Sequence, residues 1–142
     1  MRINRNVILA IASIFLVFNL NAQQAVEKTL VKSFNLQGND VIDLNLKGDI
    51  EMKEWNSAIV RVEMLISLEN GNEMLLKSLI KAGRYNLHSV ETEDAYQISI
   101  PGLNRDVTVK GMTLIDKVSY VISVPSEVNI RESEGRTVQI ER

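Results

Sequence analysis

The sequence predicts a mainly β protein, a solenoid-like or sandwich-like stack of short strands with one short amphipathic helix at about residues 72–82. Three observations lead to this prediction. Apolar and polar residues alternate with a period of two through most of the chain after residue 26, as in half-buried strands. Turn-forming pairs with Gly or Pro separate the alternating runs. One stretch has helical spacing instead.

The composition is that of one folded domain. The chain has 142 residues, 45% of them apolar and 24% charged, which is too apolar for a disordered polymer. It has no Cys and one His. Disulfide frameworks, cysteine nucleophiles and most zinc sites are therefore excluded.

Residues 1–22 have the three parts of a secretory signal peptide. Two arginines precede the uncharged apolar run Val7–Phe18, and a short polar stretch then ends at Ala22. A helix of these 12 residues is about 18 Å long, short of the roughly 30 Å hydrocarbon core of a bilayer. We therefore expect cleavage after Ala22, no membrane span after cleavage, and a single β-rich domain over residues 23–142.

Charge excludes one class of partner. Loss of the two leader arginines changes the formal charge from −2 to −4, and an acidic surface gives no electrostatic basis for binding nucleic-acid phosphates. An exported chain without disulfides depends on a packed core or a sheet ladder. We expect a periplasmic, cell-surface or secreted protein with no nucleic-acid partner.

Seven runs alternate clearly enough to be predicted as strands. In each run every second residue is apolar, so one face of the strand is expected to be buried. The runs are residues 42–46, 50–52, 60–68, 96–100, 118–124, 128–130 and 138–140.

The helical stretch has an apolar stripe from Leu75 to Ile80. Asn70 is the predicted N-cap and Gly83 stands where a C-terminal capping glycine belongs. The alternative is a hairpin turn at Asn70-Gly71, but the helical spacing beyond it favours the helix. We expect this helix to cover one open side of the apolar core.

Two units of the chain have the same pattern. Ile42–Met52 is centred on Gly48 and Val128–Ile140 on Gly135, two glycines that are 87 positions apart. Each unit has alternating apolar residues on both sides of its glycine. Solenoids are usually stable only with three or more stacked units, so a repeat and independent hairpins in a sandwich both remain open.

Several segments resemble, in their order, an uncharacterised bacterial adhesin-like family, the auto-transporter adhesins of the head GIN type. They are Gly48–Trp55, Val60–Glu63, the helix, Tyr96–Ile100 and Val118–Ile130. The Asn-Ala-Gln end of the leader is similar to those of exported proteins of the Bacteroidetes. The resemblance covers roughly residues 34–140 and implies a β-solenoid of glycine-centred rungs, with no defined functional residues. Longer members continue with further rungs, so this chain is expected to be a short or truncated member.

The polar clusters give little support for catalysis. His88 and Ser89 are neighbours and would point to opposite faces of a strand, which argues against a catalytic dyad. Glu91, Glu93 and Asp94 lack the spacing of a calcium loop and are interpreted as a solvated turn.

Three glutamates are candidates for the paired carboxylates of glycoside hydrolysis, namely Glu51, Glu54 and Glu63. Glu51 and Glu63 lie on the polar faces of predicted strands, where solvent prevents the raised pKa that a general acid needs. We therefore expect no enzyme, no metal and no cofactor.

Trp55 is the candidate binding residue. If Trp55 is exposed, it can stack on a sugar or anchor a partner. If it is buried, it caps the core at a corner of the chain, and this second interpretation is favoured. Four methionines are predicted to fill gaps in the core: Met52, Met64, Met74 and Met112.

The sequence therefore predicts an exported, non-enzymatic β-rich domain with a structural or adhesin-like binding role at the cell envelope. The alternative is a periplasmic accessory or sensor domain that binds another envelope protein. The expected partner is an envelope protein or a surface glycan.

Overall fold

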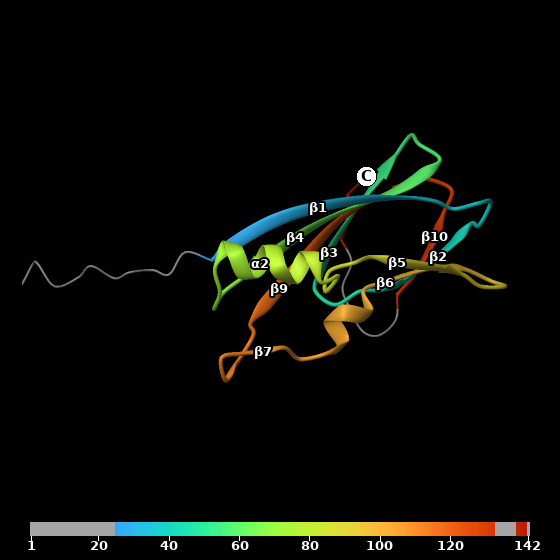
Figure 1. Ribbon diagram of the computed structural model, residues 1–142. Coiled ribbons are helices and arrows are strands. Elements are labelled where there is room, and N and C mark those ends of the chain that lie inside the picture. Colours follow the sequence, from blue (N-terminus) through green and yellow to red (C-terminus); the bar gives the residue numbers. More distant parts are fainter. Residues whose placement is uncertain (1–24, 133–138, 142) are drawn as a thin grey trace, which may run out of the picture.

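The computed structural model describes residues 25–132 and 139–141 (Figure 1). The predicted signal peptide, residues 1–22, lies outside the described residues, as does Gly135 of the second repeated unit. Within the described part, no helix is both long and apolar enough to cross a membrane.

The described fold is mainly β, as predicted, and its strands form two sheets that face each other and one small hairpin (Figure 1). Sheet A has the order β1 (Val26–Asn35), β4 (Ile59–Leu68), β9 (Asp116–Pro125), β3 (Asp49–Trp55) and β11 (Gln139–Glu141). Sheet B has the order β10 (Asn129–Glu132), β2 (Val41–Asn45), β6 (Tyr96–Ser99) and β5 (His88–Glu91). The hairpin joins β7 (Thr108–Val109) to β8 (Met112–Thr113), and a 3-10 helix, η1, spans Pro101–Asn104.

Parallel and antiparallel pairing occur together. Strand β3 runs parallel to β9 and β11, and β2 runs parallel to β6 and β10. The pairs β1–β4, β4–β9 and β5–β6 are antiparallel. Each sheet is therefore parallel at the end formed by β10 and β11 and antiparallel at the other end.

The two units with a shared pattern are neighbours in both sheets. Ile130 lies beside Ile42 in sheet B, and Ile140 lies beside Met52 in sheet A. The offset is 88 positions on both ladders, one more than the spacing of the two glycines. The shared pattern thus corresponds to strands that stack in register.

Gly48 forms the corner at which the chain passes from sheet B to sheet A. Its φ is +128°, and a Cβ at this position would lie 1.8 Å from the carbonyl oxygen of Val118. The Tyr120 hydroxyl donates a hydrogen bond to the neighbouring Lys47 carbonyl at 3.1 Å. Only glycine fits this corner, because both the backbone angle and the close approach exclude a side chain.

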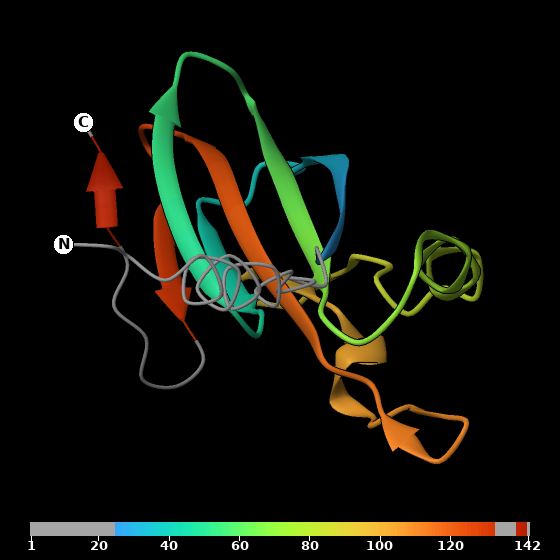
Figure 2. The same cartoon turned by 90° about the vertical axis from the view of Figure 1, so that its left-hand side faces the viewer.

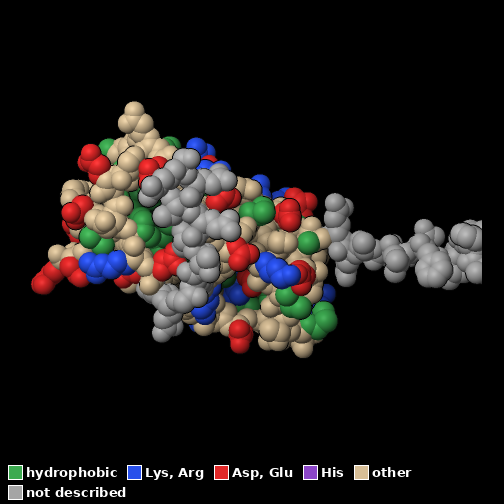
Figure 3. Space-filling model, turned by 180° about the vertical axis from the view of Figure 1, so that it is seen from behind, with side chains coloured by type: hydrophobic (Ala, Val, Ile, Leu, Met, Phe, Trp, Pro, Cys, Tyr) green, Lys and Arg blue, Asp and Glu red, His purple; other side chains and the backbone are tan. Residues whose placement is uncertain are grey.

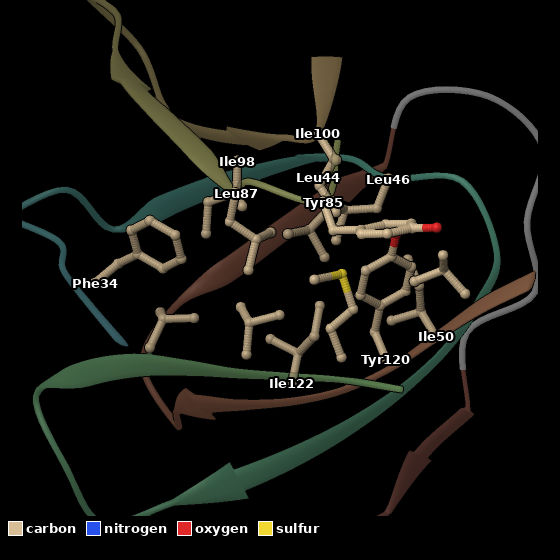
Figure 4. Close-up of a cluster of buried hydrophobic side chains, with 14 of the residues drawn as sticks. Phe34, Leu44, Leu46, Ile50, Tyr85, Leu87, Ile98, Ile100, Tyr120 and Ile122 are labelled. Atoms are coloured by element: carbon tan, nitrogen blue, oxygen red, sulfur yellow. The ribbon is translucent and has the colours of Figure 1, made fainter. Parts of the chain in front are cut away.

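The core fills the space between the two sheets (Figure 4). Every second residue of β9 is buried, and the same alternation holds for β4 and β2. Side chains from both sheets point toward one another, with Tyr85 and Tyr120 close together at one end of the cluster. Among the described residues, every residue that is buried as a whole is apolar or aromatic.

Helix α2 (Glu73–Lys81) confirms the predicted helix, but its N-cap is Asn72 rather than Asn70. The Asn72 side chain accepts a hydrogen bond from the Leu75 N–H at 2.9 Å. Asn70 instead donates to the Thr113 carbonyl and accepts from the Ile115 N–H, which joins the chain before the helix to the segment before β9.

The apolar stripe of α2 packs on the core, as predicted. Leu76 is buried, and Leu75, Leu79 and Ile80 are partly buried against the same cluster. Gly83 follows the helix with a φ of +81°, the left-handed conformation of a capping glycine.

Two of the four methionines are not in the core. Met52 and Met64 are buried as predicted, but Met74 is 77% exposed and Met112 is 61% exposed. Met74 lies on the solvent face of α2, and Met112 lies in a two-residue strand of the hairpin, where no second sheet covers it.

Candidate binding surface

The outer face of sheet A presents rows of side chains that run across the strands. Because neighbouring strands are in register, Glu51, Val121 and Glu63 form one row. Lys53, Ser123 and Arg61 form the next. All six side chains lie on the face opposite the buried alternating residues.

Small side chains occupy the middle of this face. Ser119, Val121 and Ser123 of β9 are only partly exposed, and longer charged side chains flank Val121 and Ser123 on β3 and β4. We call these three residues the central strip. A strip of short side chains between longer ones gives an extended ligand direct access to the strand surface.

The flanking charges are paired along their own strands. Lys53 Nζ lies 2.9 Å from a carboxylate oxygen of Glu51, and an Arg61 nitrogen lies 3.2 Å from Glu63. These side chains are between 39% and 46% exposed. Such pairs contribute little to stability and remain available to a ligand. On the molecular face seen in Figure 3, acidic and basic side chains are likewise interspersed.

The three glutamates considered for hydrolysis do not form one site. Glu51 and Glu63 share the outer face but lie two strands apart, about 9.5 Å between backbones. Glu54 has the opposite orientation in β3, level with Val124, and is exposed.

Trp55 lies on the same outer face as Glu51 and Lys53, at the end of β3. Its side chain is half-buried, and its indole N–H donates to the Ile59 carbonyl at 2.9 Å. Pro125 is its neighbour in β9. The ring is thus held at one corner of the outer face, with part of its surface in solvent.

The acidic turn before β6 is held by protein groups. Asn39 donates to Glu91 at 3.0 Å, and Arg131 donates to the Asp94 carboxylate at 3.1 Å. The Arg131 guanidinium holds the pKa of Asp94 below its usual value. Over residues 25–132, where side chains are described, no cluster of three or more His, Asp or Glu side chains has the arrangement of a metal site.

His88 and Ser89 point to opposite faces of β5, as predicted. His88 is level with Ser99 on the outer face of sheet B, whereas Ser89 is level with the buried Ile98. The Ser89 hydroxyl accepts a hydrogen bond from the Tyr96 hydroxyl at 3.0 Å. The two residues do not form a dyad.

A partly buried polar cluster joins α2, η1 and β9. Arg84 donates two hydrogen bonds to the Asp116 carboxylate, at 2.7 and 3.1 Å, and two more to the carbonyls of Gly102 and Arg105. Tyr85 donates to the same carboxylate at 2.9 Å. The Arg84 and Asp116 side chains are only 9% exposed.

The cluster shifts the ionisation of its members. Burial raises the pKa of Asp116, but the hydrogen bonds from Arg84 and Tyr85 outweigh this effect, so the net shift is downward. Burial, and then the hydrogen bond to Asp116, raises the pKa of Tyr85. No local sequence pattern marks this cluster, because Arg84 and Asp116 are 32 positions apart.

Two grooves flank α2. One, of about 520 Å³, lies between α2 and the β7–β8 hairpin, with Met74 and Met112 in its lining. The other, of about 660 Å³, lies between β1 and the segment from Tyr85 to Ser89. Beside the second groove, Lys32 Nζ donates to the Leu87 carbonyl at 2.7 Å.

Comparison with known proteins finds structural likeness only. No family model matches this sequence, and no curated protein matches it. A "putative adhesin" from Bacteroides fragilis has a TM-score of 0.44 and 14% identity, over 80% of this chain and 44% of that one. A "putative cell adhesion protein" from Clostridium sporogenes has a TM-score of 0.43 and 12% identity, over 75% of this chain and 46% of that one. The chain thus spans less than half the length of either structure. The resemblance to the head GIN type stays a prediction.

Proposed function

We propose that the chain is an exported, non-enzymatic β-rich domain that binds a surface glycan at the cell envelope in an adhesin-like role. In this proposal residues 1–22 direct export, and residues 23–142 form the binding domain as a short solenoid-like stack. The observation that carries the proposal is the outer face of sheet A, where the central strip lies between charged side chains and near a fixed Trp.

These features suit a carbohydrate chain. The hydroxyls of Ser119 and Ser123 and the carboxylates of Glu51 and Glu63 supply donors and acceptors for sugar hydroxyls. Trp55, held by its hydrogen bond to the Ile59 carbonyl, supplies an apolar surface on which a sugar ring stacks. Affinity then comes from many weak contacts along an extended ligand, without a deep pocket.

A substitution in the central strip tests this proposal. Val121→Lys places a long side chain between Glu51 and Glu63, whose carboxylates compensate its charge, so the fold should be kept. Gln97→Lys is the matched control, since Gln97 lies beside Asp43 on the outer face of sheet B. The measurement is retention of the purified protein on envelope polysaccharide.

We expect the parent and Gln97→Lys to be retained and Val121→Lys to be lost from the polysaccharide. Equal retention of Val121→Lys would refute binding through the central strip. Recovery of one stoichiometric protein partner, with no polysaccharide retention, would favour the accessory role instead. Export is tested separately by cell fractionation and by N-terminal sequencing, which should begin at Gln23.

A further inference from the structure

Strand β10 has backbone groups that no described strand pairs. It is the edge strand of sheet B, with β2 on its inner side. The Asn129 N–H donates to the Asp40 carbonyl at 2.8 Å, so Asn129 faces β2. Because backbone groups alternate along a strand, Arg131 also faces β2. The N–H and C=O groups of Ile130 and Glu132 therefore point away from the sheet.

At the opposite end of the molecule, the edge of sheet A is obstructed. Edge strand β1 contacts α2, and Lys32 bonds to the Leu87 carbonyl beside it. It also has exposed charges at Glu27 and Lys28. Charged side chains and a covering helix are the usual protections of a sheet edge. Figure 2 shows this end, with α2 at the right, and the red strands β10 and β11 at the left.

We propose that a second copy of this chain pairs with β10 through its own β10, antiparallel and about a two-fold axis. Unpaired strand groups are satisfied best by the edge of another strand. A second copy brings an identical strand with the same outward backbone groups, and a two-fold axis makes identical strands antiparallel. Sheet B then continues from one subunit into the next.

The sequence of β10 fixes the register of this pairing. Ile130 is partly buried on the core side of the strand, at the end of a row formed with Ile42 and Tyr96. With Ile130 opposite Ile130 of the partner subunit, the apolar row continues across the axis. Asn129 then lies opposite Arg131 of the partner subunit, which is a compatible polar pair on the outer face. A shift of this pairing by one residue would place Ile130 opposite a residue of the outer face instead of opposite Ile130 of the partner subunit.

Two neighbouring proline substitutions distinguish loss of the pairing between subunits from loss of stability of the single subunit. Ile130→Pro removes an outward N–H, which edge strands tolerate, and should leave the inner ladder intact. Asn129→Pro removes the N–H that bonds to Asp40 and should lower the melting temperature. The measurement is sedimentation velocity over a concentration series, using the protein as the producing cell processes it.

The parent and Asn129→Pro should show a sedimentation coefficient that rises with concentration, and Ile130→Pro should lose this rise. A parent that stays monomeric over the whole series overturns the proposal, and so does dimerisation of Ile130→Pro at the parent's concentrations. Neither result bears on glycan retention, which depends on sheet A.

Cysteine cross-linking tests the register, because the chain has no Cys of its own. The double variant Asn129→Cys with Arg131→Cys should give a covalent dimer on mild oxidation, since these positions face each other across the axis. The control is His88→Cys with Val90→Cys, which has the same spacing on β5, the other edge of sheet B. Cross-linking of the control alone, or of neither variant, overturns the proposed pairing.

Discussion

The partly buried Arg84–Tyr85–Asp116 cluster determines how firmly the end of α2 is joined to sheet A. Arg84→Met keeps a long side chain but removes the cation, which leaves the Asp116 carboxylate with the Tyr85 hydroxyl. Removal of one partner from a buried ion pair costs about 3 to 5 kcal/mol. Domains of this size have only about 5 to 15 kcal/mol of stability. We therefore expect a large loss in the free energy of unfolding, measured by urea denaturation and circular dichroism.

Arg131→Met is the matched control for this prediction. Arg131 and Asp94 also form an ion pair at 3.1 Å, but their side chains are 52% and 72% exposed. Exposed pairs contribute about 0 to 1 kcal/mol, so this variant should unfold almost like the parent. The double variant Arg84→Met with Asp116→Leu should recover part of the loss, because no buried charge is left unpaired. If Arg84→Met is no less stable than Arg131→Met, the reasoning about burial is wrong.

Three further predictions use the same unfolding measurements. Gly48→Ala should cost at least about 3 kcal/mol because strain and a backbone clash combine, whereas Gly111→Ala, with a φ of +81° and open space, should cost about 1 to 2 kcal/mol. Leu76→Ala should cost about 2 to 5 kcal/mol, whereas the exposed Met74→Ala should change stability by less than about 0.5 kcal/mol. The lowered pKa of Asp116 gives stability that is complete above about pH 4 and is lost as the pH falls through the folded-state pKa. In Asp116→Asn this acid-dependent part of the pH profile should disappear; an unchanged profile would contradict the assignment.

The sequence predicts the strands in which apolar and polar residues alternate, and it predicts the helix because its apolar residues have a different spacing. In β9 every second residue faces the core, so one periodicity identifies both the strand and its buried face. Helix α2 is as clear because its stripe has a different period. The Gly48 corner is also visible, because it interrupts one alternating run and begins another.

The N-terminal part of β1 shows what local pattern misses. Only Phe34 is buried in this strand, so no regular alternation marks it, and its conformation depends on pairing with β4. The order of the strands is equally invisible in sequence. Strand β10 follows β9 in the chain but lies in the other sheet, beyond β2. The proposed binding surface combines β3, β4 and β9, so the sequence predicts only part of it, through Trp55.

The shared pattern of the two units also explains why the ends of the molecule differ. In both units the strands before and after the glycine lie in different sheets, so the second unit adds β10 to sheet B and β11 to sheet A at the same end of the fold. At the other end, β1 and β4 run antiparallel to the stack and α2 packs beside them. A further strand could not pair beside β1 at this end, because it would meet the charged side chains of that edge and helix α2. Strand β10 repeats the alternating pattern of β2, its neighbour in sheet B. The backbone groups of β10 that point away from the sheet are therefore suited to pairing with one more strand.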